Sequence, residues 1–243
     1  MGSSDGPDDE AGVRRTVLFD LDGTLADSAA LITEHLALAI TKIGGPRPAP
    51  EVLRTLVGPP LDTGLLAIGL SADQTRAARL AYDATYNPIA PTHTPVYPGI
   101  RELLARLRDA GMQLAVATSK PEPLAVRVAA GLGFSEFLTV VGGADEANGR
   151  GTKADVVASV LERLGLDPAH APVVMVGDRH HDVDGAAAHG VPAIGVGWGY
   201  ARPGELTGAV AVVPDVAALE TVLLGPWAWA GNREASDRRG PGH

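Results

Sequence analysis

The stretch Val17-Leu18-Phe19-Asp20-Leu21-Asp22-Gly23-Thr24-Leu25 constrains this chain more than any other part of it. A short apolar run with β-branched and aromatic residues ends in two carboxylates one residue apart, and a glycine follows. The run predicts a buried parallel strand, and the glycine predicts a sharp exit from that strand. Asp20 and Asp22 would then lie just beyond its carboxyl end, where open α/β sheets carry their sites. Because close carboxylates repel each other, the pattern predicts a bound cation such as Mg²⁺.

Later parts of the chain alternate between strand and helix patterns. Apolar runs predict five further strands, at Leu114–Ala117, Leu138–Val141, Val173–Val176, Ala193–Val196 and Val210–Val213. Between them lie amphipathic patterns with a helical period, for example the apolar positions of 100–107 and 156–164. This alternation predicts an α/β fold with a doubly wound, Rossmann-like parallel sheet.

The segment between the first strand and Tyr97 has only helical patterns. Ser71 to Gln74 forms a capping box that opens a helix towards Tyr86, and Gly58-Pro59-Pro60 predicts a stiff turn between two short helices. We therefore expect a helical cap domain over 31–92, inserted into an α/β core domain of 15–30 and 93–224. We expect residues 1–14 to form a disordered tail. Residues 225–243 form a C-terminal tail, in which Trp227 and Trp229 are candidates for docking onto the core.

Charge and composition narrow the function classes. The net charge of −9 argues against a nucleic-acid partner, since such proteins present basic patches to phosphates. The chain has no cysteine, which excludes disulfides, thiolate metal sites and cysteine nucleophiles. No apolar run is long enough to span a bilayer, and no signal-peptide pattern is present. We expect a cytoplasmic enzyme without a membrane partner, either a monomer or a weak homodimer.

Polar residues follow three of the predicted strands. Asp20 and Asp22 follow the first, Thr118 and Ser119 the second, and Asp178 and Asp182 the fourth, while Lys153 opens a helix after a glycine-rich loop. The carboxyl ends of parallel strands meet at one edge of the sheet. Carboxylates, a hydroxyl and a lysine together predict a site for a phosphate group and Mg²⁺.

With these motifs the chain resembles the haloacid dehalogenase-like (HAD) hydrolase superfamily. Four motifs match in order, namely Asp20-Leu21-Asp22-Gly23-Thr24, Thr118, Lys153, and Gly177-Asp178-Arg179 with Asp182. The resemblance covers roughly 16–224. The stretches 58–61, 118–121 and 177–183 look like the phosphoglycolate phosphatase and nucleotidase-like branch, and the position of the insertion resembles that of the helical cap type.

The resemblance implies a role for each matching residue. Asp20 would be the nucleophile that forms an aspartyl-phosphate. Asp22 would be general acid and then base, with its backbone carbonyl as a metal ligand. Thr118 would hold the phosphoryl group, and Lys153 would neutralise it and keep Asp20 ionised. The metal ligands would be Asp20, Asp22 and Asp178, with Asp182 acting through water.

Other residues are candidates for binding the substrate. The backbone N–H groups of Leu21 and Gly23 could face the phosphate. The remaining candidates are Thr24, Ser119, Lys120, Gly58 and Arg54, of which Arg54 is the best-placed cap cation because it precedes the Gly58 turn. We interpret Arg76 and Arg79 as solvated helix charges, and His180-His181 as solvent-facing loop residues and not half of a metal site.

The function expected from this resemblance is a Mg²⁺-dependent phosphatase. Its substrate would be a small phosphorylated metabolite of the phosphoglycolate, sugar-phosphate or nucleotide kind. Two alternatives stay open. One is a phosphotransferase, either a sugar-phosphate mutase or a protein tyrosine kinase-like enzyme, because 177–190 also looks like a HAD-fold protein described as a tyrosine kinase. The other is a non-catalytic HAD-fold binding module. No glycine-rich ATP-binding loop is visible in the sequence.

Overall fold

A computed structural model describes residues 14–226. Within that range the strands form one six-stranded sheet in the order β3-β2-β1-β4-β5-β6, and every neighbouring pair is parallel. The strands are β1 (Thr16–Phe19), β2 (Gln113–Pro121), β3 (Val140–Ala144), β4 (Val173–Gly177), β5 (Ala193–Val196) and β6 (Ala211–Val213). The order reverses at β1, which lies between β2 and β4. The doubly wound α/β fold predicted from the sequence is confirmed.

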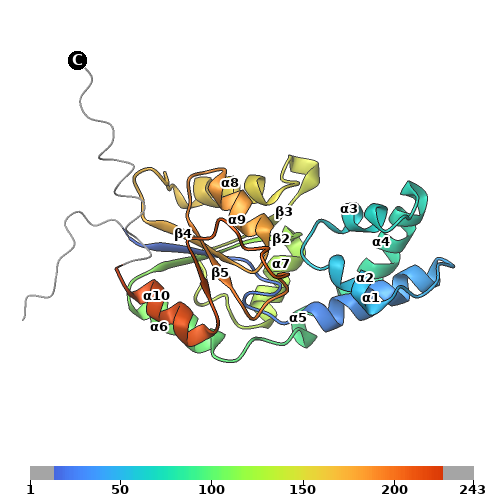
Figure 1. The fold of residues 1–243 in the computed structure, drawn as a ribbon, viewed down its shortest axis with the longest axis horizontal. Coiled ribbons are helices and arrows are strands. Elements are labelled where there is room, and N and C mark those ends of the chain that lie inside the picture. The colour runs from blue at the N-terminus through green and yellow to red at the C-terminus, as the bar shows by residue number, and fades with distance from the viewer. Residues whose placement is uncertain (1–13, 227–243) are drawn as a thin grey trace, which may run out of the picture.

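Helices cover both faces of the sheet because the strand side chains alternate between the faces. Leu18 points into a cluster with α8 (Lys153–Leu164) and α9 (His180–Ala187). Val17 and Phe19 point into the larger opposite cluster. Figure 1 shows α6 (Ile100–Asp109) and α10 (Val216–Leu224) together on that opposite side, and residues of α7 (Glu122–Gly131) join the same cluster.

A second group of helices stands beside the sheet (Figure 1). It contains α1 (Ala29–Lys42), α2 (Pro50–Thr55), α3 (Leu61–Ala67) and α4 (Ala72–Tyr86), and the short α5 (Ala90–His93) leads back to the core. The predicted capping box of α4 is present, since Ser71 accepts the Gln74 N–H and the Gln74 side chain accepts the Ser71 N–H. The proline turn at 58–60 lies between α2 and α3, as predicted. We refer to these inserted helices as the cap.

The register of the sheet brings the predicted polar residues to one edge. Phe19 at the end of β1 is level with Val116 of β2 and Val176 of β4. One or two residues beyond this aligned row, the three neighbouring strands carry polar residues: Asp20 after β1, Thr118 in β2 and Asp178 after β4. This edge carries the candidate site.

Some predicted elements differ from the structure. The third strand begins at Val140 and not at Leu138, because Leu138 N–H donates to Phe134 O in a turn that follows α7. The second strand extends beyond Ala117 to Pro121, which pairs with Ala144 of β3 after an irregularity in register. The prediction of a loop at His180-His181 is wrong, since these residues open α9 and are half-buried.

Two sequence predictions fall on the chain ends. Most of the tail predicted over 1–14, and the tryptophans at 227 and 229, lie outside the described residues. Among residues 14–226, no helix combines the length and apolar character needed to cross a membrane.

Candidate active site

Lys153 lies at the centre of the site. It is the first residue of α8, directly after Thr152, which caps that helix by a capping box with Asp155. The Lys153 Nζ atom is 2.8 Å from Asp20 Oδ1 and 2.8 Å from Asp182 Oδ1, and it donates to the Ala117 carbonyl at 3.0 Å. The ammonium is buried, so these three oxygens replace its water. The predicted proximity of Lys153 to Asp20 is present in the structure.

Three buried carboxylates surround this lysine. Asp20, Asp178 and Asp182 each offer an oxygen atom, and these atoms lie within 4.8 Å of one another. Burial, and then the neighbouring Asp182 and Asp20, raise the pKa of Asp178 well above its ordinary value. Burial also raises the pKa of Asp182 to about 6, although Lys153 opposes that shift. With Lys153 the ionised cluster carries a net charge of −2, so its oxygen donors and its charge both fit one divalent cation.

The Asp178 carboxylate is fixed by its surroundings. Thr24 Oγ1 donates to Asp178 Oδ1 at 3.3 Å, and the Tyr200 N–H donates to Oδ2 at 2.7 Å. A Cβ on Gly23, which has a φ of +91°, would lie 2.3 Å from Asp178 Oδ2, so only glycine fits there. Thr24, predicted to bind substrate, thus supports the carboxylate. The Gly23 N–H donates to Ala26 O, so the prediction that it faces a phosphate is wrong in this structure.

Tyr200 connects the Asp178 side of the site to the start of the cap, and sequence reasoning missed it. Its backbone holds Asp178, while its hydroxyl accepts the N–H of Ala29 at 3.0 Å and donates to Asp27 at 3.1 Å. Trp198 nearby donates its indole N–H to Thr24 O. No short motif marks these residues in the sequence.

Asp22 points away from the three-carboxylate cluster. Its Oδ2 is 3.0 Å from Nζ of Lys120, which also donates to the Tyr86 hydroxyl at 2.9 Å. Burial opposes the charge of Lys120, but Asp22 and Tyr86 outweigh it and raise the pKa of the ammonium. The other carboxyl oxygen of Asp22, Oδ1, is buried without a hydrogen-bond partner. The metal-ligand role predicted for the Asp22 carbonyl stays a prediction.

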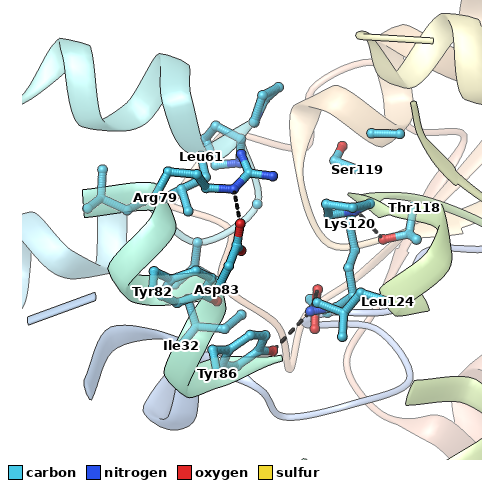
Figure 2. A pocket seen from close by; sticks show the side chains of 18 of the residues that line it. Ile32, Leu61, Arg79, Tyr82, Asp83, Tyr86, Thr118, Ser119, Lys120 and Leu124 are labelled. Carbon is cyan, nitrogen blue, oxygen red and sulfur yellow. Dashed lines mark hydrogen bonds and ion pairs between the residues drawn. The ribbon is translucent and has the colours of Figure 1, made fainter. Parts of the chain in front are cut away.

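A cavity of about 340 Å³ lies between the sheet edge and the cap. Figure 2 shows Thr118, Ser119 and Lys120 on one side of it and the α4 residues Arg79, Tyr82, Asp83 and Tyr86 on the other. Asp20, Asp22 and Gly58 also line it. The structure therefore brings together three of the predicted catalytic residues, Asp20, Asp22 and Thr118. Three of the predicted substrate-binding residues, Gly58, Ser119 and Lys120, line the same cavity. Leu21 is fully buried behind them.

The cap cation that faces the cavity differs from the one predicted. Arg54 lines a separate hollow between α1 and α2 with Asp27, Glu34 and Arg47. Arg79 lines the cavity instead, so its interpretation as a solvated charge is wrong. Its position on α4, three and seven residues before Tyr82 and Tyr86, is the signal that could have placed it on the same helix face.

Arg179 joins the motif that contains Asp178 and Asp182 to the cap. Its guanidinium donates to the Val57 carbonyl through Nη1 and to Glu205 Oε1 through Nε at 2.6 Å. A Cβ on Gly58, whose φ is +108°, would lie 2.7 Å from Arg179 Nη1. The glycine thus allows the turn between α2 and α3 to lie against this arginine. The backbone N–H of Arg179 donates to Asp182 Oδ2 at 3.0 Å.

This arrangement of motifs agrees with a family match. Residues 17–196 match the model of the haloacid dehalogenase-like hydrolases, which is most of the chain. The chain belongs to the haloacid dehalogenase-like hydrolase family. A structure from Clostridium acetobutylicum described as a predicted phosphatase superposes on this HAD fold with a TM-score of 0.80, at 31% identity, covering 88% of this chain and 99% of that one.

Relatives within the HAD family carry different names. The tyrosine-protein kinase PtkA of Mycobacterium tuberculosis is 46% identical over 186 residues, which are 76% of this chain and 63% of that protein, so the chain spans less than two thirds of its length. A Pseudomonas aeruginosa 5′-nucleotidase is 33% identical over 85% of this chain and 94% of its own. A Shigella boydii phosphoglycolate phosphatase is 31% identical over 76% and 82%. The predicted resemblance to the phosphoglycolate phosphatase-like branch is confirmed.

Proposed function

We propose that this protein is a Mg²⁺-dependent phosphatase that hydrolyses a small phosphomonoester through an aspartyl-phosphate on Asp20. The observation that carries the proposal is the position of Asp20. Its carboxylate lines the cavity, and one oxygen contacts the buried ammonium of Lys153 at 2.8 Å. That contact orients the carboxylate, as a nucleophile requires. The phosphatase and nucleotidase names among the relatives support the same reaction.

In the first step an oxygen of Asp20 forms a bond to phosphorus, and the bond from phosphorus to the alcohol oxygen breaks. Asp22 donates its proton to the departing oxygen from the same cavity wall. In the second step Asp22 takes a proton from a water molecule that attacks the aspartyl-phosphate. Phosphate leaves, and both carboxyl groups return to their starting states. Thr118 holds a phosphoryl oxygen during both steps, while Lys153 holds the Asp20 carboxylate in place.

Asp20 and Asp178 would hold the Mg²⁺ ion, with Asp182 beside them in the cluster of oxygens. The bound ion supplies positive charge that offsets repulsion between the Asp20 carboxylate and the phosphate. Asp182 has a second task, because its two oxygens contact Lys153 and the Arg179 N–H. It therefore positions the lysine that contacts the nucleophile.

The substitution Asp20→Asn tests the nucleophile. An amide does not attack phosphorus as a carboxylate does, so we expect phosphate release from p-nitrophenyl phosphate with Mg²⁺ to fall on the order of 10⁴-fold or more. Asp73→Asn, the same change at an exposed position of α4, is the control and should keep full activity. Multiple turnovers by a folded, deamidation-checked Asp20→Asn sample would overturn the covalent mechanism.

Phosphoryl transfer to another acceptor is a second candidate, favoured by the 46% identity to PtkA. Both candidates share the aspartyl-phosphate and differ in what attacks it. Incubation with radiolabelled ATP and a tyrosine peptide separates them. With the label in the γ-phosphate of ATP, a kinase moves the label to the peptide in an Asp20-dependent manner, whereas a hydrolase leaves the peptide unlabelled and releases any label it removes as inorganic phosphate.

A further inference from the structure

The part of the cavity farther from Asp20 carries charged side chains from α4. Arg79 and Asp83 both line it, and Figure 2 shows the Arg79 guanidinium on the cap side, across from Ser119 and Lys120. An arginine in this place suggests an anchor for a substrate carboxylate. The contacts of Arg79 argue against that interpretation.

Two carboxylates already neutralise Arg79. Its Nε is 3.0 Å from Asp83 Oδ2, and its Nη1 is 3.0 Å from Asp62 Oδ1. Burial lowers the pKa of Arg79, but Asp83 and Asp62 outweigh it and raise the pKa, so the group is a fully charged cation. One positive and two negative charges leave this group with a net charge of −1.

The opposite wall adds more negative charge. Asp145 and Glu146 line the cavity beside Ala144 at the end of β3. Arg150 contacts Asp145 at 3.1 Å, but the same guanidinium is 3.3 Å from Glu122. Among the described side chains that line the cavity, five carboxylates therefore face two cations, Arg79 and Lys120.

The phosphate end of a substrate has its own partners, because Thr118 and the proposed Mg²⁺ lie at the Asp20 end. The remainder of the substrate meets the negative walls and an apolar surface that includes Ile32, Tyr82, Tyr86 and Leu124. A second negative charge there would lie among like charges beside apolar side chains, which is unfavourable. Hydroxyl, amide or amino groups would find both donors and acceptors in the pair formed by Arg79 and Asp83.

We infer that the cavity takes phosphomonoesters whose alcohol part carries no negative charge, such as a neutral sugar or nucleoside, and that Arg79 and Asp83 select against a carboxylate. This inference rests on the proposed phosphatase function. A cavity of about 340 Å³ also offers more room than a two-carbon acid needs. Arg79 and Asp83 are thus specificity-determining residues that lie away from the reacting atoms.

A matched set of two-carbon esters tests the inference. Ethyl phosphate, phosphoethanolamine and phosphoglycolate differ at the distal end mainly in charge. We expect kcat/KM for phosphoglycolate to lie roughly tenfold or more below that for ethyl phosphate, as like-charge contact requires. Phosphoethanolamine should be at least as good as ethyl phosphate. A neutral nucleoside attached to the phosphate should raise kcat/KM further.

Charge variants then assign the effect to residues. Asp83→Asn should raise the ratio of phosphoglycolate to ethyl phosphate, and Arg79→Gln should lower it. Asp62→Asn repeats the test at a partner of Arg79 that does not line the cavity. Asp73→Asn, at an exposed position, is the control and should leave the ratio unchanged. Melting temperatures check that each variant folds. Variants with the same ratio as the parent chain would contradict the assignment to this pair.

The outcomes separate two kinds of failure. Preference for phosphoglycolate, lost in Arg79→Gln, would show that Arg79 anchors a carboxylate and would overturn the inference while the phosphatase function stands. Absence of phosphate release from every ester, p-nitrophenyl phosphate included, would overturn the proposed function and this inference with it.

Discussion

Lys120 and Asp22 form a buried ion pair in which the two residues have different roles. The sequence predicts Lys120 as a substrate-binding residue, yet in the structure Lys120 contacts Asp22 and Tyr86 of the cap. The lysine holds one oxygen of Asp22, and the buried Oδ1 has no hydrogen-bond partner. We expect Lys120 to fix the orientation of the Asp22 carboxyl group towards the departing oxygen.

Replacing Asp22 by asparagine should separate the two steps of the reaction. Loss of a proton donor slows the departure of an alkyl alcohol by about 10²–10⁴-fold, whereas p-nitrophenolate leaves without a proton. Asp22→Asn should therefore form the aspartyl-phosphate faster from p-nitrophenyl phosphate than from an alkyl phosphate. It should then stall, because the base for hydrolysis is missing. Rapid-quench measurement should show a burst of p-nitrophenol followed by slow turnover.

Equal losses in the first step for both leaving groups would show that Asp22 is not the acid.

Lys120→Met is the companion variant. It leaves a buried carboxylate unpaired, so we expect it to lower the free energy of unfolding by about 3 kcal/mol. The Asp22→Asn/Lys120→Met double variant should lose less than the sum of the single losses, because the two residues contact each other.

Helix α9 depends on Glu205, which lies in the loop after β5. Glu205 contacts Arg179 at 2.6 Å and His180 Nδ1 at 3.0 Å, and it accepts the Arg202 N–H at 2.9 Å. Burial raises the pKa of Glu205, but these hydrogen bonds outweigh it and lower the pKa to about 2. The carboxylate thus anchors the first turn of α9, and through Arg179 it also supports the turn of the cap at Val57.

Glu205→Gln should destabilise the protein in a pH-dependent way. A carboxyl group whose pKa falls from 4.5 to about 2 on folding stabilises the fold above pH 4.5 and loses that contribution as the pH falls towards 2. At pH 7 we expect the variant to lose about 1–3 kcal/mol, the value of hydrogen bonds to a charged group. Urea unfolding at several pH values should show the difference shrinking below pH 4.5. Glu162→Gln on α8, which is exposed, should show no such trend.

The parts of this fold that can be predicted are those that depend on short, contiguous sequence patterns. The run 17–19 with its two aspartates marks β1 and its exit, and Ser71 with Gln74 marks the start of α4. Lys153, Thr118 and Asp178 could be placed because parallel strand ends share one edge. The direction in which the polar face of a cap helix points depends on how the cap packs on the core, and no local sequence pattern shows it. For that reason the sequence predicts Arg79 in solvent and Arg54 at the site. In the structure Arg79 lines the cavity, and Arg54 lines a separate hollow.

Part of the negative charge of this chain lies in one buried cluster. The net charge is −9, but the cluster of Asp20, Asp178, Asp182 and Lys153 holds two of those charges away from water. Without a cation these charges repel one another in the interior, as the raised pKa values of Asp178 and Asp182 indicate. We therefore expect the stability of the protein to depend on Mg²⁺.

Metal and pH should act on stability together. Because the folded-state pKa of Asp182 is about 6 and its ordinary value is 3.8, protonation should stabilise the metal-free fold as the pH falls through this interval. Saturating Mg²⁺ should raise the melting temperature by roughly 5–10 °C at pH 7.5 and by less at pH 5.5. Calorimetry with Mg²⁺ or a chelator measures this. Asp178→Asn should lose the Mg²⁺ response, and an unchanged response would contradict the assigned cluster.

Tyr200 gives two distant parts of the protein a common anchor. Its main chain fixes Asp178 at the end of β4, and its hydroxyl receives the first N–H of α1, where the chain enters the cap. A substitution that moves this tyrosine therefore shifts the carboxylate and the base of the cap at once. Mutational drift or protein engineering that reshapes the cap for a new substrate must leave this residue in place, or it also moves the Asp178 carboxylate. Retargeting of the cap is thus best confined to α3 and α4, away from that shared support.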